Sequence, residues 1–178
     1  LGAGGLRTDL GGTLTLNGSA TLSKLAINTT TVLLGNTNVT LSATDVVVNG
    51  GALTLGTSLN SPNVAIPNAA AITLAGGTIG LTKGPVEDVG GLNLAAGASY
   101  IWITNQSGGG MAMLRFSDLA SRSTGGTLDS HTNAGFGIYF QAPPALTNDI
   151  LGWATVGQNW ATYTGTSNVR LVAFTNYT

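Results

Sequence analysis

The sequence predicts an all-β protein that folds as a right-handed parallel β-solenoid. Three observations predict this fold: apolar residues recur in pairs spaced by two, successive pairs follow each other every seven residues over part of the chain, and Gly or Asn turn residues separate them. Residues two apart in a strand point to the same side of the sheet, so each pair marks a short strand with one buried side. An antiparallel β-sandwich is the alternative, and it would call for longer alternating runs joined by hairpins.

The apolar pairs begin at residue 14 and continue to residue 103. They are Leu14/Leu16, Leu25/Ile27, Val32/Leu34, Val39/Leu41, Val46/Val48, Leu53/Leu55, Val64/Ile66, Ile72/Leu74, Ile79/Leu81, Leu92/Leu94 and Ile101/Ile103. Five of them start at residues 25, 32, 39, 46 and 53. A heptad coiled coil shares this spacing, but residues two apart lie about 200° apart around a helix and cannot occupy one face. Three seven-residue sides would instead make a solenoid coil of roughly twenty residues.

Turn residues stand between the pairs, as in Gly35-Asn36, Asn49-Gly50-Gly51 and Gly76-Gly77. We expect the outward Thr and Asn side chains to form ladders with equivalent residues one coil away. Neither end of the sequence resembles a charged amphipathic cap. We therefore expect the solenoid to continue, either through a longer chain, of which this sequence would be a piece, or by end-to-end stacking on another copy.

The composition changes near residue 100. Every Phe, Tyr and Trp lies at or after Tyr100. We predict slim coils of short repeats over residues 1–104, followed over residues 105–178 by an aromatic-rich part with longer loops that continues or caps the same solenoid. Within this second part we expect strands at residues 111–116, 136–141 and 169–174 and loops at 107–110 and 121–133, with a short helical turn within 111–119 as an alternative.

The charge content is low and restricts the function classes. Charged residues make up 7% of the chain and the net charge is −1, whereas about 25% is usual in soluble proteins. We therefore expect no nucleic-acid partner and, without an apolar run of ~20 residues, no membrane insertion. The absence of cysteine excludes disulfides, thiolate metal sites and cysteine nucleophiles. A surface rich in Ser, Thr and Asn is typical of secreted proteins, so we predict an extracellular or cell-surface location.

The residue pattern does not indicate an enzyme. The sole histidine stands in Asp129-Ser130-His131, and the members of a catalytic triad rarely come from one tripeptide. Glu87 and Asp88 are adjacent and should point to opposite faces of a strand, which makes them a poor acid–base pair. We assign no catalytic residue, no cofactor and no metal, with a calcium site at Glu87 and Asp88 as the remaining alternative.

Two further sets of residues have a bearing on binding. Asn17, Asn28, Asn38, Asn105 and Asn176 begin formal N-glycosylation sequons, which we interpret first as turn and ladder residues. Trp102, Trp153 and Trp160 could stack on sugars, which would make the chain an adhesin or glycan-binding module for a host or cell surface. The simpler interpretation is that these aromatic side chains fill wider coils.

The C-terminal stretch resembles a segment of large bacterial surface proteins that carry autotransporter-associated β-strand repeats. The resemblance lies in Ile-Leu-Gly-Trp-Ala-Thr-Val-Gly at 150–157, Asn-Trp-Ala-Thr-Tyr at 159–163 and Val-Ala-Phe-Thr-Asn-Tyr-Thr at 172–178. It implies export, a β-helical stalk and membership of a much longer polypeptide, and it implies no catalytic residue. Its shared aromatics would serve packing; they are Trp153, Trp160, Tyr163, Phe174 and Tyr177. The chain is thus expected to be a structural segment of a stalk, fibre or surface layer that can assemble with itself.

Overall fold

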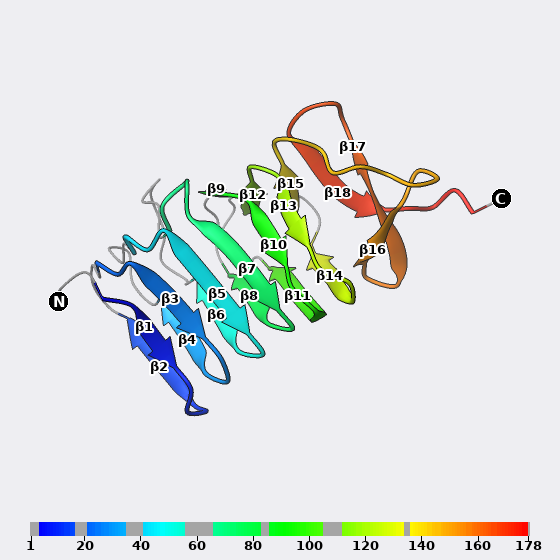
Figure 1. Cartoon of the computed structure of the whole chain (residues 1–178). Coiled ribbons are helices and arrows are strands. Elements are labelled where there is room, and N and C mark those ends of the chain that lie inside the picture. The colour runs from blue at the N-terminus through cyan, green and yellow to red at the C-terminus, as the bar shows by residue number, and fades with distance from the viewer. Residues whose placement is uncertain are drawn as a thin grey trace.

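The computed structural model describes residues 4–16, 21–34, 41–55, 66–82, 86–104, 112–133 and 136–177. Within these ranges the chain forms strands and turns and no helix. Strands of successive coils stack in parallel, so the fold is a β-solenoid whose coils advance from the N-terminal to the C-terminal end (Figure 1). This confirms the predicted fold class and excludes the antiparallel sandwich. The right-handed sense of the winding stays a prediction.

Two sides of the coil run along the solenoid. Face A is a six-stranded sheet in the order β1-β3-β5-β7-β10-β13. Its strands are β1 (Leu6–Thr8), β3 (Lys24–Ile27), β5 (Asp45–Asn49), β7 (Ala71–Ala75), β10 (Leu92–Leu94) and β13 (Leu119–Arg122). Along the chain, each strand of face A is followed, after a turn, by a strand of a second side, face B. Its strands are β2 (Thr13–Leu16), β4 (Thr31–Leu34), β6 (Ala52–Leu55), β8 (Thr78–Leu81), β11 (Gly97–Ile103) and β14 (Gly126–Thr132).

A third side, face C, closes the later coils. It consists of β9 (Val86–Val89), β12 (Met113–Phe116) and β15 (Gly137–Phe140), which pair in parallel. Each strand of face C follows a strand of face B, so these coils have the three sides that the sequence predicts.

The predicted coil length is met where the seven-residue spacing holds. Leu25 pairs with Val46 and Val32 with Leu53, so each coil here advances by three seven-residue steps. Of the pair between them, Leu41 is buried, whereas Val39 lies outside the described residues. Other coils are longer: Ile101 pairs with Ser130, 29 positions later. The coil length therefore varies along the chain, and the seven-residue spacing is local.

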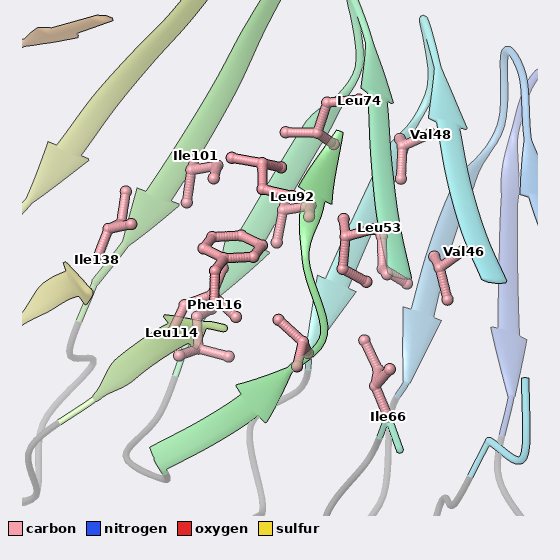
Figure 2. Packing of buried hydrophobic residues seen from close by; sticks show 14 of the residues in the cluster. Val46, Val48, Leu53, Ile66, Leu74, Leu92, Ile101, Leu114, Phe116 and Ile138 are labelled. Carbon is pink, nitrogen blue, oxygen red and sulfur yellow. The ribbon is translucent and has the colours of Figure 1, made fainter. Parts of the chain in front are cut away.

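The apolar pairs form the core. Both members of the pairs at 25, 32, 46, 53, 72, 79, 92 and 101 are buried, and Figure 2 shows several of these side chains in the space between the faces. Deleting one such side chain would cost roughly 2–5 kcal/mol. The later coils contain larger side chains, since the fully buried rings of Phe116 and Phe140 stack with centroids 5.5 Å apart.

The predicted polar ladders are present at the corner between faces A and B. Asn49 Nδ2 donates to Asn28 Oδ1 at 3.3 Å, and Asn28 Nδ2 in turn donates to Asp9. An ion pair also joins neighbouring coils on face A, where Lys24 Nζ lies 2.8 Å from Asp45 Oδ2. These contacts connect equivalent positions of successive coils.

Two local expectations are wrong. The alternative helical turn within 111–119 is strand β12, because Leu114 and Phe116 alternate into the core. The expected loop at 121–133 is mostly strand: β13 ends at Arg122 and β14 begins at Gly126. The apolar–polar alternation typical of a strand is interrupted in β14, because one of its inward residues is Ser130. Ser130 is buried and donates to the Thr155 carbonyl oxygen at 3.0 Å. The expected loop at 107–110 lies outside the described residues.

The last three strands cover the C-terminal end of the solenoid, where the sequence left both a continuation and a cap open. The C-terminal cap consists of β16 (Leu151–Val156), β17 (Asn159–Thr164) and β18 (Val169–Ala173). Strand β16 adds in parallel to β14, and β18 pairs antiparallel with β15, so the cap joins the ends of faces B and C into one twelve-stranded sheet (Figure 1). The cap does not have the charged amphipathic sequence that is usual for such elements, because its strands consist mainly of Thr, aromatic and aliphatic residues.

Candidate functional site

Aromatic and polar side chains lie on the outer surface of face B near the C-terminal cap. Tyr100 and Trp102 alternate with the buried Ile101 and point outward from β11. In register beside them on β14 stand Asp129, opposite Tyr100, and His131, opposite Trp102. The next strand, β16, places Thr155 beside Asp129.

A cavity of about 260 Å³ opens where β14, β16 and β17 lie side by side. We call it the tryptophan pocket; its lining residues are Thr127, Asp129, Trp153, Thr155 and Trp160, together with Ala98, Ser99, Leu128 and Gly152. The strands position these residues: Thr155 follows Trp153 by two on β16, and Trp160 pairs with Thr155 across the turn to β17. Two of the three tryptophans singled out in the sequence thus share one cavity.

The two tryptophans of the pocket differ in their surroundings. The side chain of Trp153 is partly buried and packs against the hydrophobic core while also lining the cavity. Trp160 is 45% exposed, and its backbone N–H donates to Tyr177 Oη at 3.3 Å. Tyr177 is itself 60% exposed, with its ring edge-on to Phe174. Packing therefore accounts for Trp153 and for the partly buried Tyr163, but not for Trp160 and Tyr177.

Asp129 contributes a negative charge to the pocket, and a hydrogen bond from Thr155 holds its carboxylate. Thr155 Oγ1 donates to Asp129 Oδ1 at 2.7 Å, whereas the described residues supply no hydrogen bond to Oδ2. No Lys or Arg lines the pocket. Burial, and secondarily the charge of Asp129, raise the pKa of the neighbouring Tyr100 above its usual 10.0.

Trp102 lies outside this pocket. Its ring covers Gly80 on the neighbouring strand β8, where a Cβ atom would overlap the indole. The glycine lets the ring lie flat against the sheet. The structure thus separates Trp102 from Trp153 and Trp160.

The other candidate residues do not form an acid–base or metal site. In Asp129-Ser130-His131, Ser130 points into the core while its neighbours point outward, so the three do not converge. Glu87 is buried and accepts from the Ile66 backbone N–H at 2.8 Å. On the opposite side of the same strand, Asp88 binds Arg115 through both carboxylate oxygens, at 2.5 and 2.6 Å.

Over the described ranges, no group of three His, Asp or Glu residues is placed to hold a metal ion. Of the sequon residues, Asn28 belongs to the polar ladder and Asn176 is exposed, whereas Asn17, Asn38 and Asn105 lie outside the described residues.

Sequence reasoning missed the polar half of the pocket. Thr127 and Thr155 were not singled out, and Asp129 was considered only as a neighbour of His131, because the meeting of these residues depends on the pairing of β14 with a strand 26 residues later. One signal was available: Thr127, Asp129 and His131 alternate with Leu128 and Ser130, which marks an outward row on one strand.

Comparison with known proteins gives no further assignment. The chain matches no family model, and neither a curated protein nor a solved structure is significantly similar to it. In the part of the chain that the structure describes, no helix has the length and apolar character to cross a membrane.

Proposed function

We propose that this chain is an extracellular, non-enzymatic structural segment of a large bacterial surface protein, in which it forms one end of a β-solenoid stalk. The low charge content and the resemblance of residues 150–178 to proteins with autotransporter-associated β-strand repeats support this proposal. The observation that carries it is the difference between the two ends of the solenoid.

Within the described residues, the cap covers the C-terminal end, whereas no strand pairs with the outer edges of β1 and β2. Strands β1 and β2 are the outermost strands of faces A and B. In these strands, Leu6, Leu14 and Leu16 are only partly buried. Their register partners in the next coil, Leu25, Val32 and Leu34, are buried. An unprotected strand edge is a template for pairing with another strand.

We assign the N-terminal end to stacking on further strands, either a parallel coil of a longer chain or the same edges of a second copy, whose strands would run antiparallel. Because the C-terminal cap covers the opposite end, self-association of the 178-residue chain should stop at pairs joined through their N-terminal ends. The aliphatic side chains at that end would then be buried at roughly 1.5–3 kcal/mol each.

Light scattering after size-exclusion chromatography, combined with electron microscopy, tests this assignment. We expect the wild-type chain to form pairs as its concentration rises. The double variant Leu14→Lys, Leu16→Lys should stay monomeric, because it places charges on the stacking surface.

The matched control is Val86→Lys, which changes a 44% exposed residue on face C. This variant should pair as the wild type does. Wild-type monomers at all concentrations would contradict the stacking assignment, and fibres with a ~4.8 Å axial spacing would contradict the terminating role of the cap.

A further inference from the structure

We propose that the tryptophan pocket binds one ring of a neutral sugar, with stacking on Trp160 and Trp153 and hydrogen bonds to Asp129 and Thr127. This proposal is independent of the stalk function, since the strands β14, β16 and β17 that line the pocket lie at the other end of the strand order from β1 and β2.

The aromatic side chains supply the stacking surface. An indole ring carries negative charge on its faces, and one face of a pyranose presents C–H groups that are polarised positive. Trp160 lines the cavity and is 45% exposed. Smaller apolar side chains, such as those of Leu128 and Leu151, are buried in the core. Exposed large apolar groups that rim a concave site are typical of binding surfaces.

Two polar groups are free to hold sugar hydroxyls. Asp129 lines the pocket and accepts the Thr155 hydroxyl at Oδ1, while the described residues give no hydrogen bond to its Oδ2. Thr127 is exposed on the same strand, and its hydroxyl makes no hydrogen bond to the described residues. Adjacent hydroxyls of a sugar can donate to the carboxylate and accept from the threonine. These bonds are charge-assisted on the carboxylate side and therefore stronger than neutral ones.

The charge and size of the pocket restrict the ligand. Among the described residues that line the pocket, Asp129 alone is charged, so sugars that carry a carboxylate, such as sialic or uronic acids, are repelled. A volume of about 260 Å³ is below the ~300–1,000 Å³ of pockets that enclose drug-sized ligands. One ring fits, with the rest of a glycan outside.

A quaternary ammonium group is the competing ligand, because cations also bind over indole faces. Such cations are usually enclosed by an aromatic cage, whereas here two indoles line the pocket together with hydroxyls, one carboxylate and the apolar residues Ala98, Leu128 and Gly152. The hydroxyl-bearing lining favours the sugar.

The test uses the whole chain. A glycan array with neutral hexose and N-acetylhexosamine chains, and matched chains that end in sialic or uronic acid, identifies the ligand. Calorimetric titrations with the best neutral glycan and with choline follow. We expect the neutral glycan to bind with a Kd of about 1 mM or below, and the acidic glycans and choline to bind at least about tenfold more weakly.

Variants locate the site. Trp160→Ala should weaken binding by about tenfold or more, as loss of an aromatic stacking partner does for other flat ligands. Trp102→Ala is the matched control, because it removes an outward tryptophan of the same sheet from outside the pocket, and it should leave the Kd unchanged. Thermal unfolding checks that each variant is folded, and Asp129→Asn provides a second variant that removes no packing.

The outcomes are decisive. Loss of binding in folded Trp160→Ala and Asp129→Asn, with binding kept in Trp102→Ala, supports the proposal. Absence of neutral-glycan binding, preference for choline or acidic sugars, or full binding by both pocket variants would overturn it.

Discussion

Pairs of glycines turn the chain from face A to face B. In Gly50-Gly51, Gly76-Gly77 and Gly125-Gly126, the first glycine has a φ of 70°, 72° or 78°, in the left-handed region that residues with a Cβ rarely adopt. The second glycine of each pair lies against the backbone of a neighbouring segment. A Cβ at Gly51 would stand 2.6 Å from the Asn28 carbonyl oxygen and 2.7 Å from that of Thr30. The two glycines thus serve different purposes, one conformational and one steric.

The substitution Gly51→Ala should therefore destabilise the protein, since the methyl group meets backbone atoms that are fixed in the stacked coils. We expect the free energy of unfolding to fall by about 1–3 kcal/mol, the usual cost of overpacking. Denaturant unfolding monitored by tryptophan fluorescence measures it.

Gly152→Ala is the control, because a Cβ at that position in β16 meets no atom within 4 Å and the backbone is not left-handed. It should be neutral or stabilising by up to ~1 kcal/mol. Equal losses in both variants would show that close packing at Gly51 does not matter.

The sequence predicts individual inward residues well, because strand alternation is a local property. Pairs such as Leu25/Ile27 and Ile101/Ile103 are buried as expected. The pocket was beyond prediction for a physical reason: Asp129 and Trp153 meet only through the register between β14 and β16, which depends on the length of the connection. Local patterns do not determine that register where the coil length varies.

The C-terminal cap is the element in which this fold departs from simple repetition. Its strands run antiparallel to one another, yet β16 continues face B in parallel and β18 pairs with the last strand of face C. Val169, Leu171, Ala161 and Ala154 point from it into the end of the core. Arg170 Nη2 adds a bond to the Phe136 carbonyl oxygen at 2.6 Å. The cap therefore buries apolar side chains and closes two strand edges together.

Leu171→Ala should loosen this cap. Leu171 is 4% exposed, and truncation of such a side chain costs about 2–5 kcal/mol. As the edges of β14 and β15 become accessible, the variant should also aggregate faster than wild type on warming. Denaturant unfolding and light scattering during a temperature ramp measure the two effects.

Val172→Ala is the neighbouring control, because Val172 points the other way on β18 and is only partly buried. It should cost less than about 1.5 kcal/mol and leave aggregation unchanged. A larger effect at Val172 than at Leu171 would contradict the assignment of the inward face of β18.

Over the whole molecule, few groups can couple folding to pH. The chain has seven Asp and Glu residues. Two of these pair with cations of a neighbouring coil, Asp45 with Lys24 and Asp88 with Arg115. The Lys24–Asp45 pair is largely exposed and contributes at most about 1 kcal/mol, whereas the Asp88–Arg115 pair is partly buried. Stability therefore rests chiefly on stacked backbone hydrogen bonds and buried aliphatic side chains, which do not titrate.

Two shifted groups set the limits of the pH range in which we expect constant stability. Hydrogen bonds from Arg7 and then Asn28 lower the pKa of Asp9 below its usual 3.8. Because the folded state favours the carboxylate, its contribution is present above pH 3.8 and is lost as the pH falls through the folded-state pKa. The pKa of Tyr100 is raised above 10.0, so its contribution is present below pH 10.0 and is lost as the pH rises through the folded-state pKa.

We therefore predict that the free energy of unfolding is nearly constant from about pH 5 to pH 9 and declines on both sides. Guanidinium unfolding between pH 3 and pH 11 measures this profile. Asp9→Asn should reduce the acid decline alone, and Tyr100→Phe should reduce the alkaline decline alone, because each removes one titrating group. A steep slope between pH 5 and pH 9, or an alkaline decline that is unchanged in Tyr100→Phe, would show that other ionisable groups control the stability of the solenoid.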